Sequence, residues 1–366
     1  MKLDFDAFPV GTVFNELGRD LGDVEPVTER VTISYPSRLE AMALDPGKIA
    51  DNNNLIYPAG QIDFSVAVPK TITVTLSSET GNISVSDRTT RKPLVQHAAA
   101  ITLQALRSPE GIGIDVSTDL DLRHCGLGSS SSLVAGVAAG INELFGRPLE
   151  ALELSRYCAQ NHGEEIDTDP SKLMPVQCIG GSAICGHFEG GLIVLAGQAT
   201  PIFRHNLAEN KQVVIGVPTD FTHPDSQNLM NAEVENIAGF RETGEKYGPL
   251  IAYRLVHEVL PALVEGDLKP CKDLIFDYRW DMGSIRNCSF AYPPMLEIAE
   301  ELRPLRDDPN VDILSLSSVG PGFFAVTEDP SYVESIFTAL GMSVHHTAIH
   351  NAPYQIIREG ADGGQS

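Results

Sequence analysis

One segment constrains the fold of this chain more than any other: a glycine- and serine-rich loop that leads directly into a helix of small residues. It reads Cys125-Gly-Leu-Gly-Ser-Ser-Ser-Ser132 and continues as Leu-Val-Ala-Gly-Val. Glycine permits positive φ and close approach of the backbone to a ligand. The first N–H groups of a helix have no intrahelical partner, so an anion such as phosphate is favoured there. A serine-capped helix after a tight turn is the alternative interpretation.

The loop is neither of the two commonest phosphate-binding loops. No lysine follows its second glycine, as a Walker loop requires, and the glycine spacing of a dinucleotide-binding fold is absent. Its place in the sequence, between a predicted strand and a predicted helix, is therefore the stronger indication of a phosphate site.

Periodicity along the chain predicts a mixture of strands and helices. Alternating apolar residues predict strands at 31–34, 62–68, 71–76, 112–116, 192–195, 213–217, 313–317 and 323–326. Helical spacing predicts helices at 93–106, 130–145, 152–161, 248–265, 294–305 and 332–340. No strand–helix unit repeats, so we expect two α+β domains, at residues 1–205 and 206–366, rather than one doubly wound sheet.

Composition excludes several classes of function. The formal net charge of −23 argues against a nucleic-acid partner, because such partners are held by clustered Lys and Arg. The six cysteines form no CxxC pair or zinc pattern and are expected to be reduced thiols. No segment approaches the length of a membrane span. We therefore expect a cytoplasmic protein with no membrane partner. Composition does not bear on the number of subunits, and a homodimer is expected.

Gly-Leu-Gly-Ser-Ser at a strand-to-helix junction resembles the signature of the GHMP kinase superfamily, which includes galactokinase, homoserine kinase and mevalonate kinase. The resemblance implies a two-domain fold, with an N-terminal domain like domain 2 of ribosomal protein S5 and a ferredoxin-like C-terminal domain. It also implies that the loop binds phosphate, and that Ser130 contacts the metal. The phosphate-binding residues of the loop are then Gly126, Leu127, Gly128, Ser129, Ser130 and Ser131.

Four further segments are similar to one branch of that superfamily, the beta-ribofuranosylaminobenzene 5'-phosphate synthases and their C-nucleoside antibiotic relatives. They are Tyr35-Pro-Ser-Arg-Leu39 with Asp45 downstream, the glycine-rich centre from Gly180 to Gly191, Pro201-Ile-Phe-Arg-His205, and Ser317-Ser-Val-Gly-Pro321. The loop departs from that branch in its run of serines, and an acidic insertion lies at residues 162–169. These departures leave the aromatic acceptor open between an aminopyrazole dicarboxylate and a 4-hydroxy- or aminobenzoate.

The resemblance implies a reaction in which phosphoribosyl pyrophosphate loses pyrophosphate while a ring carbon of an aromatic carboxylate attacks C1' and carbon dioxide leaves. Pyrophosphate would be held by the loop and Mg²⁺, which commonly takes only one or two protein ligands when it binds phosphates. Glu164 and Glu165 are the expected carboxylate ligands beside Ser130. A solvated acidic loop is the alternative interpretation.

The anions of donor and acceptor also need cations. Arg38, Arg123 and Arg204 lie in the matched segments, and guanidinium forks suit phosphate and carboxylate. Asp45 would orient ribose hydroxyls or stabilise positive charge at C1', unless it only caps a loop. Ser317, Ser318 and Gly320 are expected to form a substrate-binding turn.

Two other classes of function remain open. An ATP-dependent small-molecule kinase uses the same kind of loop and metal. The Ser317–Phe323 segment, however, lacks the glycine-rich motif usual at that place in such kinases, and Pro-Ser-Arg differs from the Pro-Gly-Arg common in sugar kinases. A non-enzymatic sensor of a phosphorylated metabolite is the third interpretation.

Overall fold

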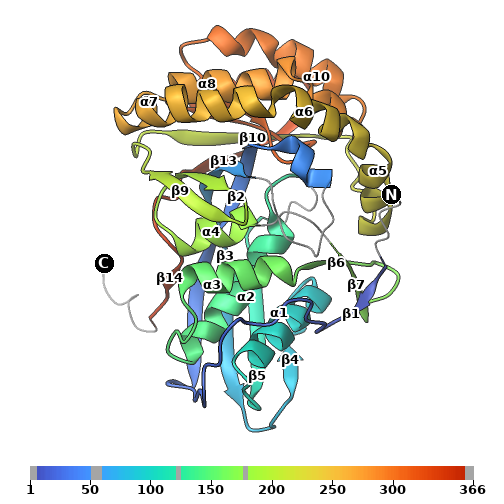
Figure 1. Ribbon diagram of the computed structural model, residues 1–366, viewed down its shortest axis with the longest axis vertical. Coiled ribbons are helices and arrows are strands. Elements are labelled where there is room, and N and C mark those ends of the chain that lie inside the picture. The colour runs from blue at the N-terminus through green and yellow to red at the C-terminus, as the bar shows by residue number, and fades with distance from the viewer. Residues whose placement is uncertain (1–5, 51–59, 121–124, 176–179, 359–366) are drawn as a thin grey trace.

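Two long antiparallel strands, β2 (Arg30–Ala43) and β3 (Gln61–Ser77), form the centre of the first sheet in the computed structural model (Figure 1). The structure describes residues 6–50, 60–120, 125–175 and 180–358. The sheet has seven strands in the order β14-β2-β3-β5-β4, with β8 paired to β3 and β9 to β8. The other strands are β4 (Ile83–Val85), β5 (Gly111–Thr118), β8 (Leu192–Ala196), β9 (Thr200–His205) and β14 (Gln355–Ile356).

Helices of the N-terminal half cover one face of this sheet. They are α1 (Lys92–Ala105), α2 (Ser129–Leu144), α3 (Ala151–Gln160) and α4 (Gly180–His187). α2 packs closely because a Cβ at Gly136 would lie 2.4 Å from the Ile72 side chain. This contact explains the small residues of α2: they let the helix that begins at the serine loop lie directly on β2 and β3.

The C-terminal half contains a four-stranded antiparallel sheet in the order β11-β12-β10-β13. Its strands are β10 (Gln212–Pro218), β11 (Ile313–Leu316), β12 (Phe323–Thr327) and β13 (Met342–Ala348). The helices of this half are α5 (Ser226–Glu235), α6 (Ile237–Arg254), α7 (Leu260–Val264), α8 (Lys269–Phe276), α9 (Ser284–Cys288), α10 (Met295–Leu302) and α11 (Pro330–Ala339). π-helical turns at Leu255–Val259 and Asp277–Asp281 continue α6 and α8.

A third, small sheet lies beside the loop region and joins β1 (Phe8–Pro9), β7 (Lys172–Pro175) and β6 (Gly163–Glu165). It matters for the site because β6 carries two of the acidic residues of the 162–169 segment. The Glu164–Met174 register within it fixes which way these residues face.

The two halves share a hydrophobic core. Phe64 of β3 and Phe324 of β12 lie with ring centroids 5.7 Å apart in one cluster of buried residues. The chain also returns at its end, because β14 pairs with β2. The expected division at residues 205 and 206 falls between β9 and β10, but β14 adds a late segment to the first sheet.

The α+β fold class is confirmed, since strands and helices mix without a repeated unit. Among the described residues, none of the helices has the length and apolar composition of a membrane span. Five of the six cysteines lie in the described residues, and all five are buried and outside any disulfide.

Candidate functional site

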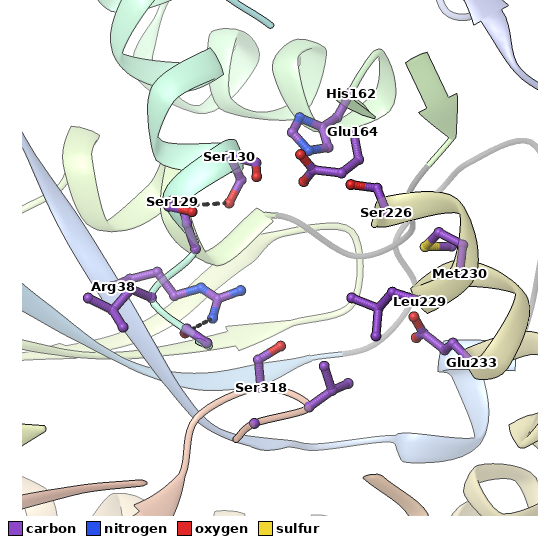
Figure 2. Close-up of a pocket in the computed structure, with 16 residues that line it drawn as sticks. Arg38, Ser129, Ser130, His162, Glu164, Ser226, Leu229, Met230, Glu233 and Ser318 are labelled. Atoms are coloured by element: carbon purple, nitrogen blue, oxygen red, sulfur yellow. Dashed lines mark hydrogen bonds between the residues drawn. The ribbon is translucent and has the colours of Figure 1, made fainter. Parts of the chain in front are cut away.

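The serine loop opens into a cleft between the two halves of the chain (Figure 2). Its walls come from β2, the start of α2, β6, α5 and the turn between β11 and β12. The described residues that line it are Arg38, Gly126, Leu127, Gly128, Ser129, Ser130, Ser131, His162, Glu164, Ser226, Leu229, Met230, Glu233, Ser318, Val319 and Gly320.

The loop places the uncapped end of α2 at the cleft. Gly126 and Gly128 have φ of +88° and +59°, and the helix begins at Ser129. Gly128 is the N-cap residue, and as a glycine it has no side chain that could cap α2. The hydroxyl of Ser132 instead donates to the Gly128 carbonyl, at 2.8 Å. The capped-helix interpretation therefore fails, and the N-terminal N–H groups of α2 are suited to an anion.

Arg91, which the sequence analysis did not single out, lies directly behind the loop. Its guanidinium donates to the hydroxyls of Ser129 (3.3 Å) and Ser130 (2.7 Å). It also forms ion pairs with Glu164 and with Glu165, whose Oε2 lies 2.6 Å from Nε. The residue is buried and has a φ of +58° just before α1. In the sequence, Arg91 is marked only by its place just before the helix predicted at 93–106. That place gives no indication of contacts with Ser129 and Ser130, some forty residues later.

A second buried cation supports the loop from β3. The ammonium of Lys70 donates to the hydroxyls of Ser132, at 2.6 Å, and Ser37, at 3.1 Å. Lys70 is only 7% exposed. The loop thus rests on two cations despite the large negative charge of the whole chain, which is the local arrangement that an anion site requires.

Arg38 lies in the cleft wall as the sequence predicted. Its Nη1 donates to the Gly126 carbonyl at 3.4 Å, and its Nη2 lies 3.5 Å from Glu40 Oε2. Its Nε lies 3.7 Å from Asp63 Oδ1, and neither Nε nor the two Asp63 oxygens has a hydrogen-bond partner among the described residues. Burial raises the pKa of Asp63 to about 8, although Arg38 opposes this rise.

The C-terminal turn closes the cleft opposite the loop. The Ser317 hydroxyl donates to the Gly126 carbonyl at 2.7 Å. Ser317 therefore connects the turn to the serine loop and does not face the cleft. Ser318 and Gly320 do line the cleft. The buried guanidinium of Arg279 holds the turn through the Ser318 carbonyl (2.9 Å) and reaches the Glu40 carbonyl (3.1 Å).

Helix α5 brings a set of residues that sequence reasoning missed. Ser226, Leu229, Met230 and Glu233 project from it toward the loop (Figure 2). Burial, together with the nearby charge of Glu40, raises the pKa of Glu233 to about 7. No sequence signal was available for this helix, because its hydrophobic pattern is weak.

A smaller cavity, of about 70 Å³, adjoins the cleft. It shares Glu233, Ser318 and Val319 with the cleft. Its other lining residues are Glu40, Ala43, Gln61, Phe240, Tyr278, Arg279 and Cys288. The lining of this cavity therefore combines apolar side chains with several charged and polar groups.

Two of the predicted residues that the structure describes, Asp45 and Arg204, do not line the cleft. Asp45 lies before the 3-10 helix Pro46–Ala50, where its carbonyl accepts from the Lys48 N–H at 3.0 Å, as a loop residue would. Arg204 lies on β9 with its guanidinium carbon 5.4 Å from the centre of the Phe188 ring, in a separate depression. The alternating side-chain directions of β9 turn Arg204 away from the loop. Arg123 lies outside the described residues.

The expected magnesium ligands do not form a ready cation site. Ser130 and Glu164 face the cleft, but both bind Arg91, and Glu165 pairs with Arg91 outside the cleft lining. No group of three or more His, Cys, Asp or Glu side chains suited to a metal occurs in the described part of the chain. The residues present therefore fit an arginine at this position better than a metal held by the protein.

Comparison with known proteins shows similarity in part of the sequence and in the fold. Residues 93–178 match the family model described as GHMP kinases N terminal domain. No curated protein sequence is significantly similar to the chain. The structure is similar to homoserine kinase from Cytophaga hutchinsonii, with a TM-score of 0.59 and 14% identity over 91% of this chain and 99% of that one.

Two further solved structures are similar over most of their length. Mevalonate pyrophosphate decarboxylase from Streptococcus pyogenes has a TM-score of 0.62 and 14% identity, over 91% of this chain and 99% of that chain. A structure described as "MDDEF in complex with MVAPP, AMPPCP and Magnesium" has a TM-score of 0.60 and 15% identity, over 90% of this chain and 99% of that chain. The chain therefore has the fold of the GHMP kinase superfamily, and the segment that matches its N-terminal domain model, residues 93–178, includes the serine loop.

Proposed function

We propose that this chain, with its GHMP kinase fold, is a C-nucleotide synthase that joins C1' of phosphoribosyl pyrophosphate to a ring carbon of an aromatic carboxylate. The observation that carries the proposal is the cleft between the loop and the Ser317–Pro321 turn. It places the N-terminal end of α2 beside Arg38, and a smaller cavity of about 70 Å³ adjoins it. The turn is the segment whose sequence resembles the synthases and differs from the kinases.

The reaction divides between these two parts of the cleft. The C1'–oxygen bond breaks and pyrophosphate leaves with the electron pair, held by the α2 N-terminus and Arg38. The acceptor ring carbon forms the new bond to C1', and loss of carbon dioxide returns an electron pair to the ring. Glu40 and Glu233 line the adjoining cavity, and in this proposal their negative charge would stabilise the positive charge that develops at C1'. They take this role in place of Asp45, which lines neither the cleft nor that cavity.

The acceptor would occupy the smaller cavity. Its apolar wall at Ala43, Phe240 and Val319 suits a flat ring, and Gln61 with the two glutamates supplies hydrogen-bond acceptors for a ring amino group. These groups favour an amino-substituted acceptor within the predicted class, an aminopyrazole dicarboxylate or an aminobenzoate. A cytoplasmic homodimer remains part of the proposal.

A small-molecule kinase is the second candidate, favoured by the structural similarity to homoserine kinase. Stoichiometry separates the two. The purified protein would be incubated with phosphoribosyl pyrophosphate and Mg²⁺ and a panel of aromatic carboxylates, and separately with ATP and small alcohols. We expect one pyrophosphate and one carbon dioxide per product in the first reaction. ADP formation with transfer to an alcohol, and no reaction with phosphoribosyl pyrophosphate, would refute the synthase proposal.

A further inference from the structure

Behind the serine loop, one guanidinium bridges the groups that were expected to hold a metal. The Nη2 atom of Arg91 donates both to the Ser130 hydroxyl, at 2.7 Å, and to Glu164. Nε pairs with Glu165 at 2.6 Å. The three charged side chains are 4%, 11% and 12% exposed, so solvent screens their interaction only weakly.

Arg91 is also fixed in place by its backbone. Its φ of +58° is unusual for a residue other than glycine, and its carbonyl accepts from the Leu94 N–H at 3.1 Å at the start of α1. Moving the guanidinium aside would break its ion pairs with Glu164 and Glu165, which is costly in a buried site.

A divalent ion between Ser130 and Glu164 would therefore have to displace a cation that already occupies that position. Mg²⁺ requires near-octahedral oxygen ligands at about 2.0 to 2.1 Å, and a guanidinium between those oxygens blocks that arrangement. The like charge of Arg91 would further oppose an ion placed beside it.

We infer that Arg91 takes the place of a protein-held divalent metal at this loop. It is a positioning residue: it orients the Ser129 and Ser130 hydroxyls at the cleft and neutralises Glu164 where an anion would otherwise meet a carboxylate. Magnesium that arrives bound to a substrate's phosphates is then part of the substrate and needs no ligand set of its own.

Titration of the full-length protein with Mn²⁺ alone, followed by electron paramagnetic resonance, tests this inference. We expect no saturable Mn²⁺ binding by the wild type. Arg91→Met removes the guanidinium from Glu164, Glu165 and Ser130, and this variant should gain a Mn²⁺ site that the double variant Arg91→Met/Glu164→Gln lacks. Saturable binding by the wild type that Glu164→Gln abolishes would overturn the inference, as would a folded Arg91→Met variant that binds no Mn²⁺.

Binding of inorganic phosphate provides a second readout. Wild-type affinity should be the same in EDTA and in Mg²⁺, whereas Arg91→Met should lose about tenfold or more in EDTA and recover part of it with Mg²⁺. Circular dichroism checks folding, and Arg91→Lys, which keeps one positive charge, serves if the methionine variant does not fold. It should bind phosphate without acquiring a Mn²⁺ site, and a Mn²⁺ site in this variant would count against the inference.

This inference rests on the proposed phosphate-binding loop only in the phosphate measurements. The Mn²⁺ titration involves neither donor nor acceptor. A protein that shows no synthase activity but gives the expected Mn²⁺ results would thus refute the proposed function and leave the inference standing.

Discussion

Arg38 is held at the cleft by contacts that are all longer than ideal hydrogen bonds. The Gly126 carbonyl lies at 3.4 Å, Glu40 at 3.5 Å and Asp63 at 3.7 Å. Short charge-assisted contacts are usually about 2.7 to 2.9 Å. These contacts hold the guanidinium in position but do not saturate its N–H donors. The donors can therefore also bind an anion in the cleft.

Replacing Arg38 with Lys tests this interpretation, because the change keeps the charge and removes the fork. Loss of a charge-assisted contact costs about 1.5 to 3 kcal/mol, so kcat/KM should fall roughly ten- to more than a hundredfold. Arg204→Lys is the matched control, since Arg204 lies outside the cleft, and its activity should match the wild type. If Arg38→Lys retains wild-type kcat/KM in steady-state assays, Arg38 does not bind the anion.

Asp63 predicts how stability depends on pH. Burial raises its pKa to about 8, whereas an unfolded chain has a carboxyl pKa near 3.9. Between about pH 4 and pH 8 the native state thus binds the extra proton, and the free energy of unfolding should fall as pH rises through that window. Two charged groups also act on the pKa of this carboxyl: Arg38 lowers it and Glu40 raises it.

Urea denaturation at a series of pH values, comparing wild type with Asp63→Asn, measures this contribution. The asparagine variant cannot ionise at this position, so its stability should decline less between about pH 5 and pH 8. Parallel curves for the two proteins would show that Asp63 ionises normally despite its burial. Glu233, which titrates in both proteins, cancels in the comparison.

At the scale of elements, the loop before α2 and the turn between β11 and β12 depend on each other. A Cβ at Gly126 would lie 2.3 Å from the Ser317 carbonyl oxygen, and the Ser317 hydroxyl donates to the Gly126 carbonyl. The loop can take its position only if residue 126 has no side chain and a positive φ. The proposed phosphate site is thus built from both halves of the chain.

Gly126→Ala should separate loop from turn. An alanine in the left-handed conformation costs about 1 to 2 kcal/mol, and we expect Gly126→Ala to lower the free energy of unfolding by clearly more than this. The variant should also bind phosphate more weakly. Gly81→Ala is the matched control: its φ is +73°, but its Cβ would meet nothing within 4 Å. It should lose only about 1 to 2 kcal/mol in urea denaturation and bind phosphate normally. Equal losses in both variants would contradict the proposed contact.

Local patterns predicted those elements whose formation depends on local sequence. The helices expected at 93–106 and 130–145 are α1 (Lys92–Ala105) and α2 (Ser129–Leu144), because periodic apolar residues and a proline or a glycine turn mark their ends. The glycine-rich 180–191 region was not expected to be helical, yet Gly180–His187 forms α4. Its packing on β3 overrides the low helix propensity of glycine.

The site was predictable only where a motif marked it. Loop, Arg38 and the C-terminal turn lie together as expected. Arg91 and Glu233 could not be predicted, because each reaches the cleft through contacts with residues distant in the chain. Conversely, Arg204 lies in a segment that resembles the synthases, but strand β9 directs it elsewhere. A resemblance in sequence order does not determine which way a side chain faces.

At the scale of the molecule, the end of the chain ties the two halves together. After β13 in the second sheet, the chain returns and β14 pairs with β2 in the first. Tyr354 stacks on Tyr35 with ring centroids 5.9 Å apart, and its hydroxyl donates to Glu143 at 2.5 Å. Together with the shared core around Phe64 and Phe324, this return predicts that both halves unfold as one unit.

Tyr354→Ala tests that coupling. The change removes a half-buried ring and its hydrogen bond, so we expect a loss of about 2 kcal/mol in unfolding free energy. The variant keeps the core that the two halves share, so calorimetry should show a single transition, as in the wild type. The Tm of that transition should be lower in the variant. Tyr253→Ala, at an exposed position on α6, should change stability by less than about 0.5 kcal/mol. Two separate transitions in the wild type would mean that the halves fold independently and that β14 does not couple them. Two transitions in Tyr354→Ala alone would identify the returning segment as the principal connection between the halves.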